Sequence, residues 1–135
     1  MARALGTDDS ITTCDCCGKS NLKFTVTVEL DDGEIVHYGQ VCARRNTGKD
    51  QRTITSEIKA HKEAQRAAAR REYFSCPAYL AERARYAERA ALPFGDSRRL
   101  GRNAADFVRE VSEAADMACR DIAARFGLLM WEVRA

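Results

Sequence analysis

The stretch CDCCGKSNLKFTVTVELDDGEIVHYGQVCARR, residues 14–45, holds four of the six cysteines of this 135-residue chain. Cys14 and Cys17 form a C-x-x-C pair, and Gly18 gives the backbone the freedom that a tight knuckle turn needs. Cys42 follows 25 residues after Cys17. The sulfur of Cys42 can meet those of Cys14 and Cys17 if the residues between Cys17 and Cys42 fold back on themselves.

The residues between Cys17 and Cys42 have the pattern of a β-hairpin. Apolar and polar side chains alternate from Phe24 to Leu30, which is the period of a half-buried strand. The turn sequence DDGE contains Asp-Gly, and the strand pattern resumes at Ile35. The following QVCARRNTG indicates a short helix that ends at Gly48, with Cys42 in its first turn.

A knuckle, a hairpin and a ligand at the start of a helix are the layout of a treble-clef zinc finger. Zn²⁺ imposes no geometry of its own and is held by tetrahedral sets of Cys and His. We therefore predict zinc as the cofactor, bound by Cys14, Cys17 and Cys42, with His37 as the fourth ligand. His61 and a bound water are the alternatives for the fourth position. A redox role is not expected, because C-x-x-C here precedes a hairpin and not a βαβ unit.

Residues 12–48 resemble the small treble-clef-like zinc-binding modules of uncharacterised bacterial and phage proteins. The resemblance implies metal binding and covers about a quarter of the chain. It depends on the pattern C-x-x-C-G-[KR], a leucine soon after it, and G-x-x-C-A, matched by Cys14, Cys17, Gly18, Lys19, Leu22, Gly39, Cys42 and Ala43.

The rest of the chain has helical character. Three helices are predicted: one from a cap at Thr53 to about Phe74, one over residues 77–92, and one from a cap at Asn103 to Gly127. The apolar face of the last helix is predicted to consist of Phe107, Val111, Ala114, Ala118, Ile122 and Phe126.

The fold class expected is therefore α+β, in which the zinc knuckle, hairpin and short helix precede three helices. The predicted domains are a zinc-binding β-hairpin module, residues 1–50, and a helical region packing on it, residues 51–135. The stretch LLMWEV near the C-terminus is expected to form a strand or an extended tail. Cys76 and Cys119 are interpreted as small buried residues on helices, and Cys16 is expected to point away from the metal.

The charge distribution suggests a partner. Residues 41–75 carry nine Lys/Arg against four Asp/Glu, whereas residues 1–40 carry three against seven. Cations at helical spacing can neutralise the phosphates of DNA or RNA, although a charged stripe is also the usual solvated face of a helix. The predicted nucleic-acid contacts are Arg44, Arg45, Lys59, Lys62, Arg66 and Arg70.

These features favour a non-enzymatic zinc-finger protein with a structural zinc that binds a macromolecule, and nucleic acid bound through a basic helix face is the first expected partner. The first alternative is a protein-interaction adaptor or an inhibitor of a host factor, since the helices are rich in alanine and weakly apolar. A metal-dependent hydrolase with an open zinc position is the third. No phosphate-binding glycine loop, H-E-x-x-H motif or nucleophile elbow occurs. The absence of a long apolar run and of a signal sequence predicts a cytoplasmic protein without a membrane partner.

Overall fold

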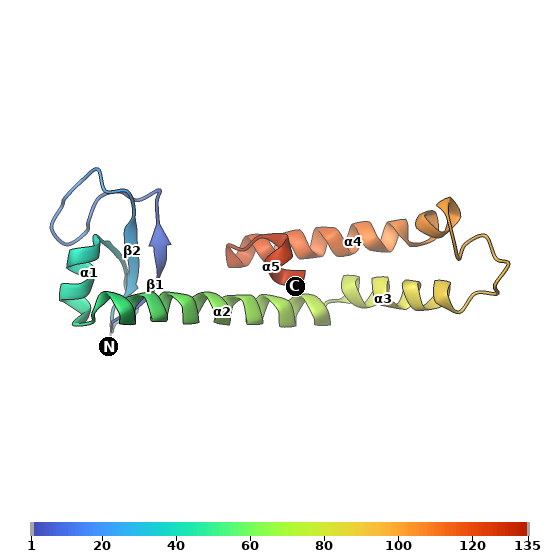
Figure 1. The fold of residues 1–135 in the computed structure, drawn as a ribbon, viewed down its shortest axis with the longest axis horizontal. Coiled ribbons are helices and arrows are strands. Elements are labelled where there is room, and N and C mark those ends of the chain that lie inside the picture. Colours follow the sequence, from blue (N-terminus) through green and yellow to red (C-terminus); the bar gives the residue numbers. More distant parts are fainter. Residues whose placement is uncertain (1, 135) are drawn as a thin grey trace. The chain divides into compact units, whose positions relative to one another are not determined.

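The computed structural model describes residues 2–134 and has an α+β fold (Figure 1). A small antiparallel sheet comes first and helices follow it, which confirms the α+β class expected from the sequence. The chain divides into two compact units, an N-terminal unit of Met1–Ala64 and a C-terminal unit of Gln65–Ala135. Helix α2, Gln51–Ser75, begins in the first unit and ends in the second.

The sheet of the N-terminal unit has the strand order β1-β2-β3. Strands β2, Thr25–Glu29, and β3, Ile35–Tyr38, form the hairpin that the sequence predicted. Val28 pairs with Val36 and Thr27 pairs with His37. Because successive side chains of a strand point to opposite faces, the valines and His37 lie on different faces of the sheet.

Strand β1, Arg3–Asp8, was not predicted. It pairs antiparallel with β2, and its register shifts between Ala4 and Gly6. The backbone N–H of Ala4 donates to Glu57 Oε2 of α2 at 3.0 Å, and Glu57 also pairs with Lys49. One carboxylate therefore ties the edge strand to the helix.

Helix α1, Gln40–Thr47, follows β3 directly and ends at Gly48, which has φ 67°. The predicted C-terminal glycine is thus in the left-handed conformation that helix ends favour. The core of the N-terminal unit lies between the sheet, α1 and the first part of α2, and consists of Ala4, Val26, Val28, Val36, Ala43 and Ile54.

The predicted helices are present with small changes at their starts. Asp50 caps α2 by accepting the N–H of Thr53 at 2.8 Å, so Thr53 is not the cap. Helix α3 spans Pro77–Ala90 and α4 spans Arg102–Phe126. Gly101, and not Asn103, occupies the N-cap position of α4. None of the helices within residues 2–134 combines the length and hydropathy that a membrane span requires.

Helices α3 and α4 lie side by side in the C-terminal unit (Figure 1). The fully buried residues of α4 are Ala104, Val108, Ala115, Cys119, Ile122 and Ala123. Of the predicted apolar face, Ile122 is fully buried, Phe107, Val111, Ala118 and Phe126 are half-buried, and Ala114 is exposed, so the buried face is rotated from the predicted one but overlaps it. The core of this unit also contains Ala69 and Tyr73 of α2. Cys119 is fully buried on α4, as interpreted from the sequence, whereas Cys76 is half-buried and lies at the N-cap of α3.

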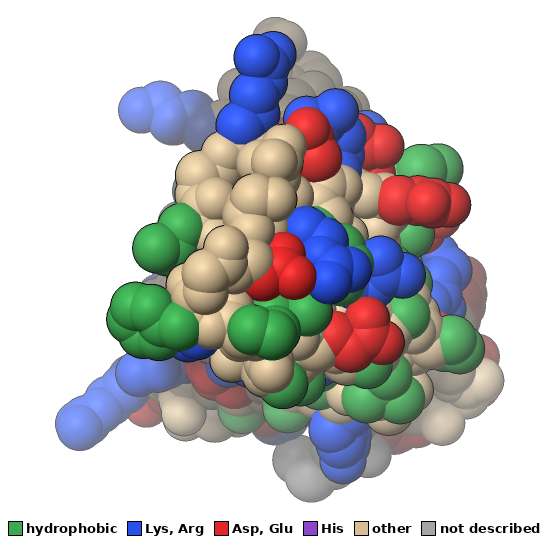
Figure 2. Space-filling model, turned by 90° about the vertical axis from the view of Figure 1, so that its right-hand side faces the viewer, with side chains coloured by type: hydrophobic (Ala, Val, Ile, Leu, Met, Phe, Trp, Pro, Cys, Tyr) green, Lys and Arg blue, Asp and Glu red, His purple; other side chains and the backbone are tan. Residues whose placement is uncertain are grey.

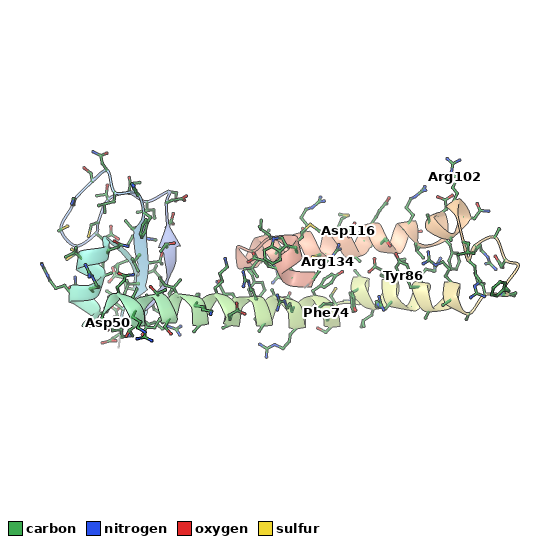
Figure 3. All side chains as sticks on the ribbon, viewed as in Figure 1. Asp50, Phe74, Tyr86, Arg102, Asp116 and Arg134 are labelled. Atoms are coloured by element: carbon green, nitrogen blue, oxygen red, sulfur yellow. The ribbon has the colours of Figure 1, made fainter. Side chains whose placement is uncertain are left out.

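The chain ends in a fifth helix, α5, Met130–Arg134, where a strand or extended tail was expected. Glu132 explains the difference. Its side chain accepts the backbone N–H of Leu129 at 2.8 Å and a hydrogen bond from Arg66 Nη2 at 2.6 Å. Arg134 of α5 also pairs with Asp116 of α4 (Figure 3). Polar contacts with residues distant in the sequence, Arg66 and Asp116, therefore hold this short helix in place.

Candidate metal centre

Three cysteine sulfurs come together in the N-terminal unit. The ligand atoms of Cys14, Cys17 and Cys42 all lie within 4.8 Å of one another, close enough to hold a metal ion. Cys14 and Cys42 are buried and Cys17 is exposed. The sequence predicted this grouping, and the structure brings together sulfurs that lie on both sides of the hairpin.

The C-x-x-C pair lies on a tight turn. Gly18 N–H donates to Cys14 O at 2.9 Å, and Cys14 N–H donates to Lys19 O at 2.9 Å. Gly18 has φ 75°, a backbone conformation that residues other than glycine rarely adopt. The turn brings the sulfurs of Cys14 and Cys17 to the same side.

Helix α1 positions the third sulfur. Gly39 precedes the helix, and its carbonyl accepts the N–H of Ala43 at 2.9 Å. Ala43 is fully buried in the core, which fixes the rotation of the helix about its axis. Cys42, one residue earlier, is thereby directed to the knuckle and not to solvent.

The three thiols are electrostatically unequal. Burial raises the pKa of Cys14, but hydrogen bonds from the backbone N–H groups of Cys17, Gly39 and Cys16 outweigh it and bring the pKa to about 7. Hydrogen bonds with the thiols of Cys17 and Cys14, together with burial, raise the pKa of Cys42 to about 12. The backbone thus favours one thiolate, and a divalent cation that replaces the remaining protons would favour all three.

His37 does not join the sulfurs. Within the described part of the chain, the group of possible metal ligands consists of the three cysteines. The ring Nδ1 of His37 lies 3.4 Å from Thr27 Oγ1, its partner across the hairpin. The backbone N–H of His37 donates to Asp15 Oδ2 at 2.7 Å, and its carbonyl accepts the N–H of Asp15 at 2.8 Å. His37 thus fixes the knuckle through its backbone.

His61 lies on α2 and lines a different cavity, of about 240 Å³, with Arg3, Ala4 and Glu57. It is not part of the sulfur group either. The two histidines of the chain are therefore both near the sheet, but neither is among the ligand atoms that the fold collects.

Cys16 lies closer to the site than the sequence suggested. Its Sγ accepts a hydrogen bond from Asn46 Nδ2 at 3.4 Å, and Asn46 also donates to Cys42 O at 2.8 Å. Its thiol contributes to the raised pKa of Cys42, after the larger effects of Cys17 and Cys14. Asn46 was not singled out from the sequence, and its position one helical turn after Cys42 was the available signal.

A cavity of about 320 Å³ opens beside the sulfurs. All three ligand cysteines line it, whereas Cys16 does not. The remaining walls are two lysines, the residues at the start of α1 and two apolar side chains: Lys19, Lys23, Gly39, Gln40, Val41, Leu22 and Phe24. The candidate metal centre therefore opens into a cavity whose walls carry both apolar and cationic side chains.

The predicted basic residues separate into two groups. Arg44, Arg45, Lys59 and Lys62 are exposed on α1 and on the first part of α2, in the N-terminal unit. Arg66 and Arg70 belong to the C-terminal unit, where Arg66 pairs with the side chain of Glu132 and Arg70 Nε donates to its backbone carbonyl at 2.9 Å. The last two cations of the predicted stripe therefore hold α5.

Comparisons with known proteins add no relative. No protein-family model matches the chain, and no curated protein or solved structure is significantly similar to it.

Proposed function

We propose that the N-terminal unit is a treble-clef-like module that binds one structural zinc ion. The observation that carries the proposal is the convergence of three cysteine sulfurs within 4.8 Å, two from the knuckle and one from the first turn of α1. Thiolates suit zinc, and a small unit with a core of few, mostly short side chains gains much from a metal crosslink. The zinc would join the knuckle to α1 and close the hairpin between them.

Metal analysis tests this proposal. Protein purified without chelator should contain one zinc per chain, and a Cys17→Ala, Cys42→Ala double variant should lose it. A Cys76→Ala variant is the matched control, because Cys76 is half-buried in the C-terminal unit and far along the chain from the sulfur group. Full zinc occupancy in the double variant would exclude the site.

For the whole protein we propose a non-enzymatic role in binding nucleic acid. The supporting observation is the exposure of Arg44, Arg45, Lys59 and Lys62 on two successive helices of the N-terminal unit. Exposed cations neutralise phosphates and release counterions, so binding should depend strongly on salt and weakly on sequence. Shift assays with duplex and single-stranded probes at several salt concentrations test this role. An absence of binding at low salt would contradict it.

A protein-interaction adaptor is the second candidate, and exposed apolar side chains of the C-terminal unit favour it. Phe94 and Leu100, in the connection between α3 and α4, are 91% and 81% exposed, and Trp131 of α5 is 61% exposed. Figure 2 shows the end of the unit at this connection, where hydrophobic side chains lie among charged ones. This mixture is typical of transient interfaces. Binding of a partner that is lost in a Phe94→Ser, Leu100→Ser variant and kept in the Lys59→Glu, Lys62→Glu variant would favour this role.

A further inference from the structure

The fourth ligand of the metal deepens the proposed function and rests on it. Three sulfurs supply three corners of a tetrahedron, and zinc sites of this kind take a fourth donor. Among residues 2–134, no histidine or carboxylate belongs to the ligand group. Cys16 accepts a hydrogen bond from Asn46 and contacts the thiol of Cys42, but it is not in the ligand group and does not line the cavity that all three ligand sulfurs share.

Gly39 occupies the position from which a fourth side chain would be expected. The spacing Gly39-x-x-Cys42 repeats the spacing Cys14-x-x-Cys17. A Cβ atom at Gly39 would lie 3.9 Å from Cys14 Cβ and 3.3 Å from the end of the Leu22 side chain, so this position faces the metal centre. Glycine supplies no donor atom there. The cavity is lined by Gly39 together with Cys14 and Leu22, the two residues that this Cβ would approach.

The chemistry of the cavity indicates what could enter it. A divalent metal with three thiolates has a net charge of −1, and a further anionic ligand would change it to −2. Lys19 and Lys23 on the cavity wall can balance these two charges. Leu22, Phe24 and Val41 make the same cavity apolar, and Val41 is 57% exposed at the start of α1.

We propose that the fourth ligand comes from outside the chain and is a thiolate, which reaches the metal through the cavity beside Gly39. Sulfur matches the softness of a three-thiolate metal site better than oxygen does, and its desolvation between apolar walls costs less than that of a carboxylate. The two lysines stabilise the anionic complex. The site is then a receptor for a thiol, completed only when that thiol is bound.

Cobalt-substituted full-length protein tests this inference, because the charge-transfer absorption of Co²⁺ rises with each bound thiolate. The protein is kept reduced with a phosphine and titrated with 2-mercaptoethanol, acetate or imidazole. 2-Mercaptoethanol should saturate and raise the charge-transfer band by about a third, as expected for three sulfurs becoming four. Acetate should have little effect at the same concentration. A Lys19→Ala, Lys23→Ala variant should bind the thiol about fivefold more weakly.

A Gly39→Cys variant supplies the missing sulfur within the chain. Gly39 has φ −60° and ψ 161°, which any residue adopts, and the Leu22 side chain can shift by the few tenths of an ångström required. This variant should show the four-sulfur spectrum without added thiol and should not respond to the titration. If the circular dichroism of this variant shows misfolding, the thiol titration of the wild-type protein alone decides whether an external thiolate is the fourth ligand.

Several outcomes would overturn the inference. Bound cobalt whose spectrum is unchanged by thiol would show that the fourth position is filled by the chain itself or by water. Loss of one ligand in Cys16→Ser or in His37→Ala would then identify the donor. A saturating response to imidazole or acetate with none to thiol would exclude thiolate as the ligand class. Failure of the wild-type protein to bind cobalt or zinc at all would instead overturn the proposed metal site, so the two failures are distinguishable.

Discussion

Arg66 of α2 donates two hydrogen bonds to one carboxylate oxygen of Glu132 in α5, from Nε at 3.0 Å and from Nη2 at 2.6 Å. The Glu132 side chain is only 5% exposed, and its other oxygen accepts the N–H of Leu129. The guanidinium of Arg66 also lies over the ring of Trp131, 5.8 Å from its centroid. One arginine thus supplies the counter-charge of a buried carboxylate that starts the last helix.

Replacement of Arg66 should therefore destabilise the C-terminal unit. An Arg66→Ala variant removes the ion pair between Arg66 and the buried carboxylate of Glu132, which costs about 3 kcal/mol in comparable cases. Arg71→Ala, at an exposed position of the same helix, should change stability by less than about 0.5 kcal/mol. Urea unfolding followed by helical circular dichroism measures both. Equal midpoints for the two variants would show that the ion pair contributes little.

The same pair shows why the end of the fold was not predictable. LLMWEV has the apolar density of a strand, and nothing within it indicates a helix of five residues. The helix depends on the ion pair between Glu132 and Arg66, which lies 66 residues earlier in the sequence. Local propensity carries no information about such a contact. Spacing alone likewise could not show that Arg66 and Arg70 contact Glu132.

Features encoded locally were predicted correctly. The hairpin followed from alternation around Asp-Gly, and the end of α1 followed from Gly48. The knuckle and the helix start also predicted that the sulfurs of Cys14, Cys17 and Cys42 come together, close enough to hold a metal ion. Strand β1 was missed because its register shift at Gly6 breaks the alternation over only six residues. His37 lies on the sheet face opposite Val36, and its ring Nδ1 is 3.4 Å from Thr27 Oγ1.

Nucleic-acid binding should respond to the exposed cations of the N-terminal unit. Reversal of Lys59 and Lys62 to glutamate should weaken binding to all sequences and flatten its salt dependence, by roughly 0.9 log units per lost phosphate contact on duplex DNA. These positions are preferable to Arg66, whose reversal would unfold α5. Zinc content should be unchanged.

Arg83→Glu with Arg120→Glu is the charge-matched control, because both residues are exposed on the C-terminal unit. This variant has the same net charge as the Lys59, Lys62 variant but keeps the proposed interface. Shift assays at several salt concentrations compare the two. Equal weakening would indicate that net charge alone, and not a defined surface, governs binding.

Glu57 should make the N-terminal unit sensitive to acid. Burial raises the pKa of Glu57, but hydrogen bonds from Lys49 and the Ala4 N–H outweigh it, so the pKa lies below its ordinary value of 4.5. A lowered pKa stabilises the fold above pH 4.5, and this contribution is lost as the pH falls through the folded-state value.

A Glu57→Gln variant isolates that contribution, since glutamine can still accept the N–H of Ala4. The variant should be less stable than the wild type by about 1 kcal/mol near pH 7, a modest value because the pair is partly exposed. The difference should shrink below pH 4.5. Chemical unfolding of wild type and variant, compared at the same zinc concentration at each pH, provides the measurement. A difference independent of pH would show that the charge of Glu57 is not responsible.

Metal removal should affect the two units differently. The core residues of the N-terminal unit are mostly small, whereas the core of the C-terminal unit contains Tyr73 and Ile122 and has no cysteine of the metal centre. A chelator should therefore expose the backbone of residues 14–48 to hydrogen exchange while residues 104–126 stay protected. The Cys17→Ala, Cys42→Ala variant should show the unprotected pattern without chelator. Loss of protection in both segments in a single transition would instead mean that the metal centre and α4 unfold as one cooperative unit.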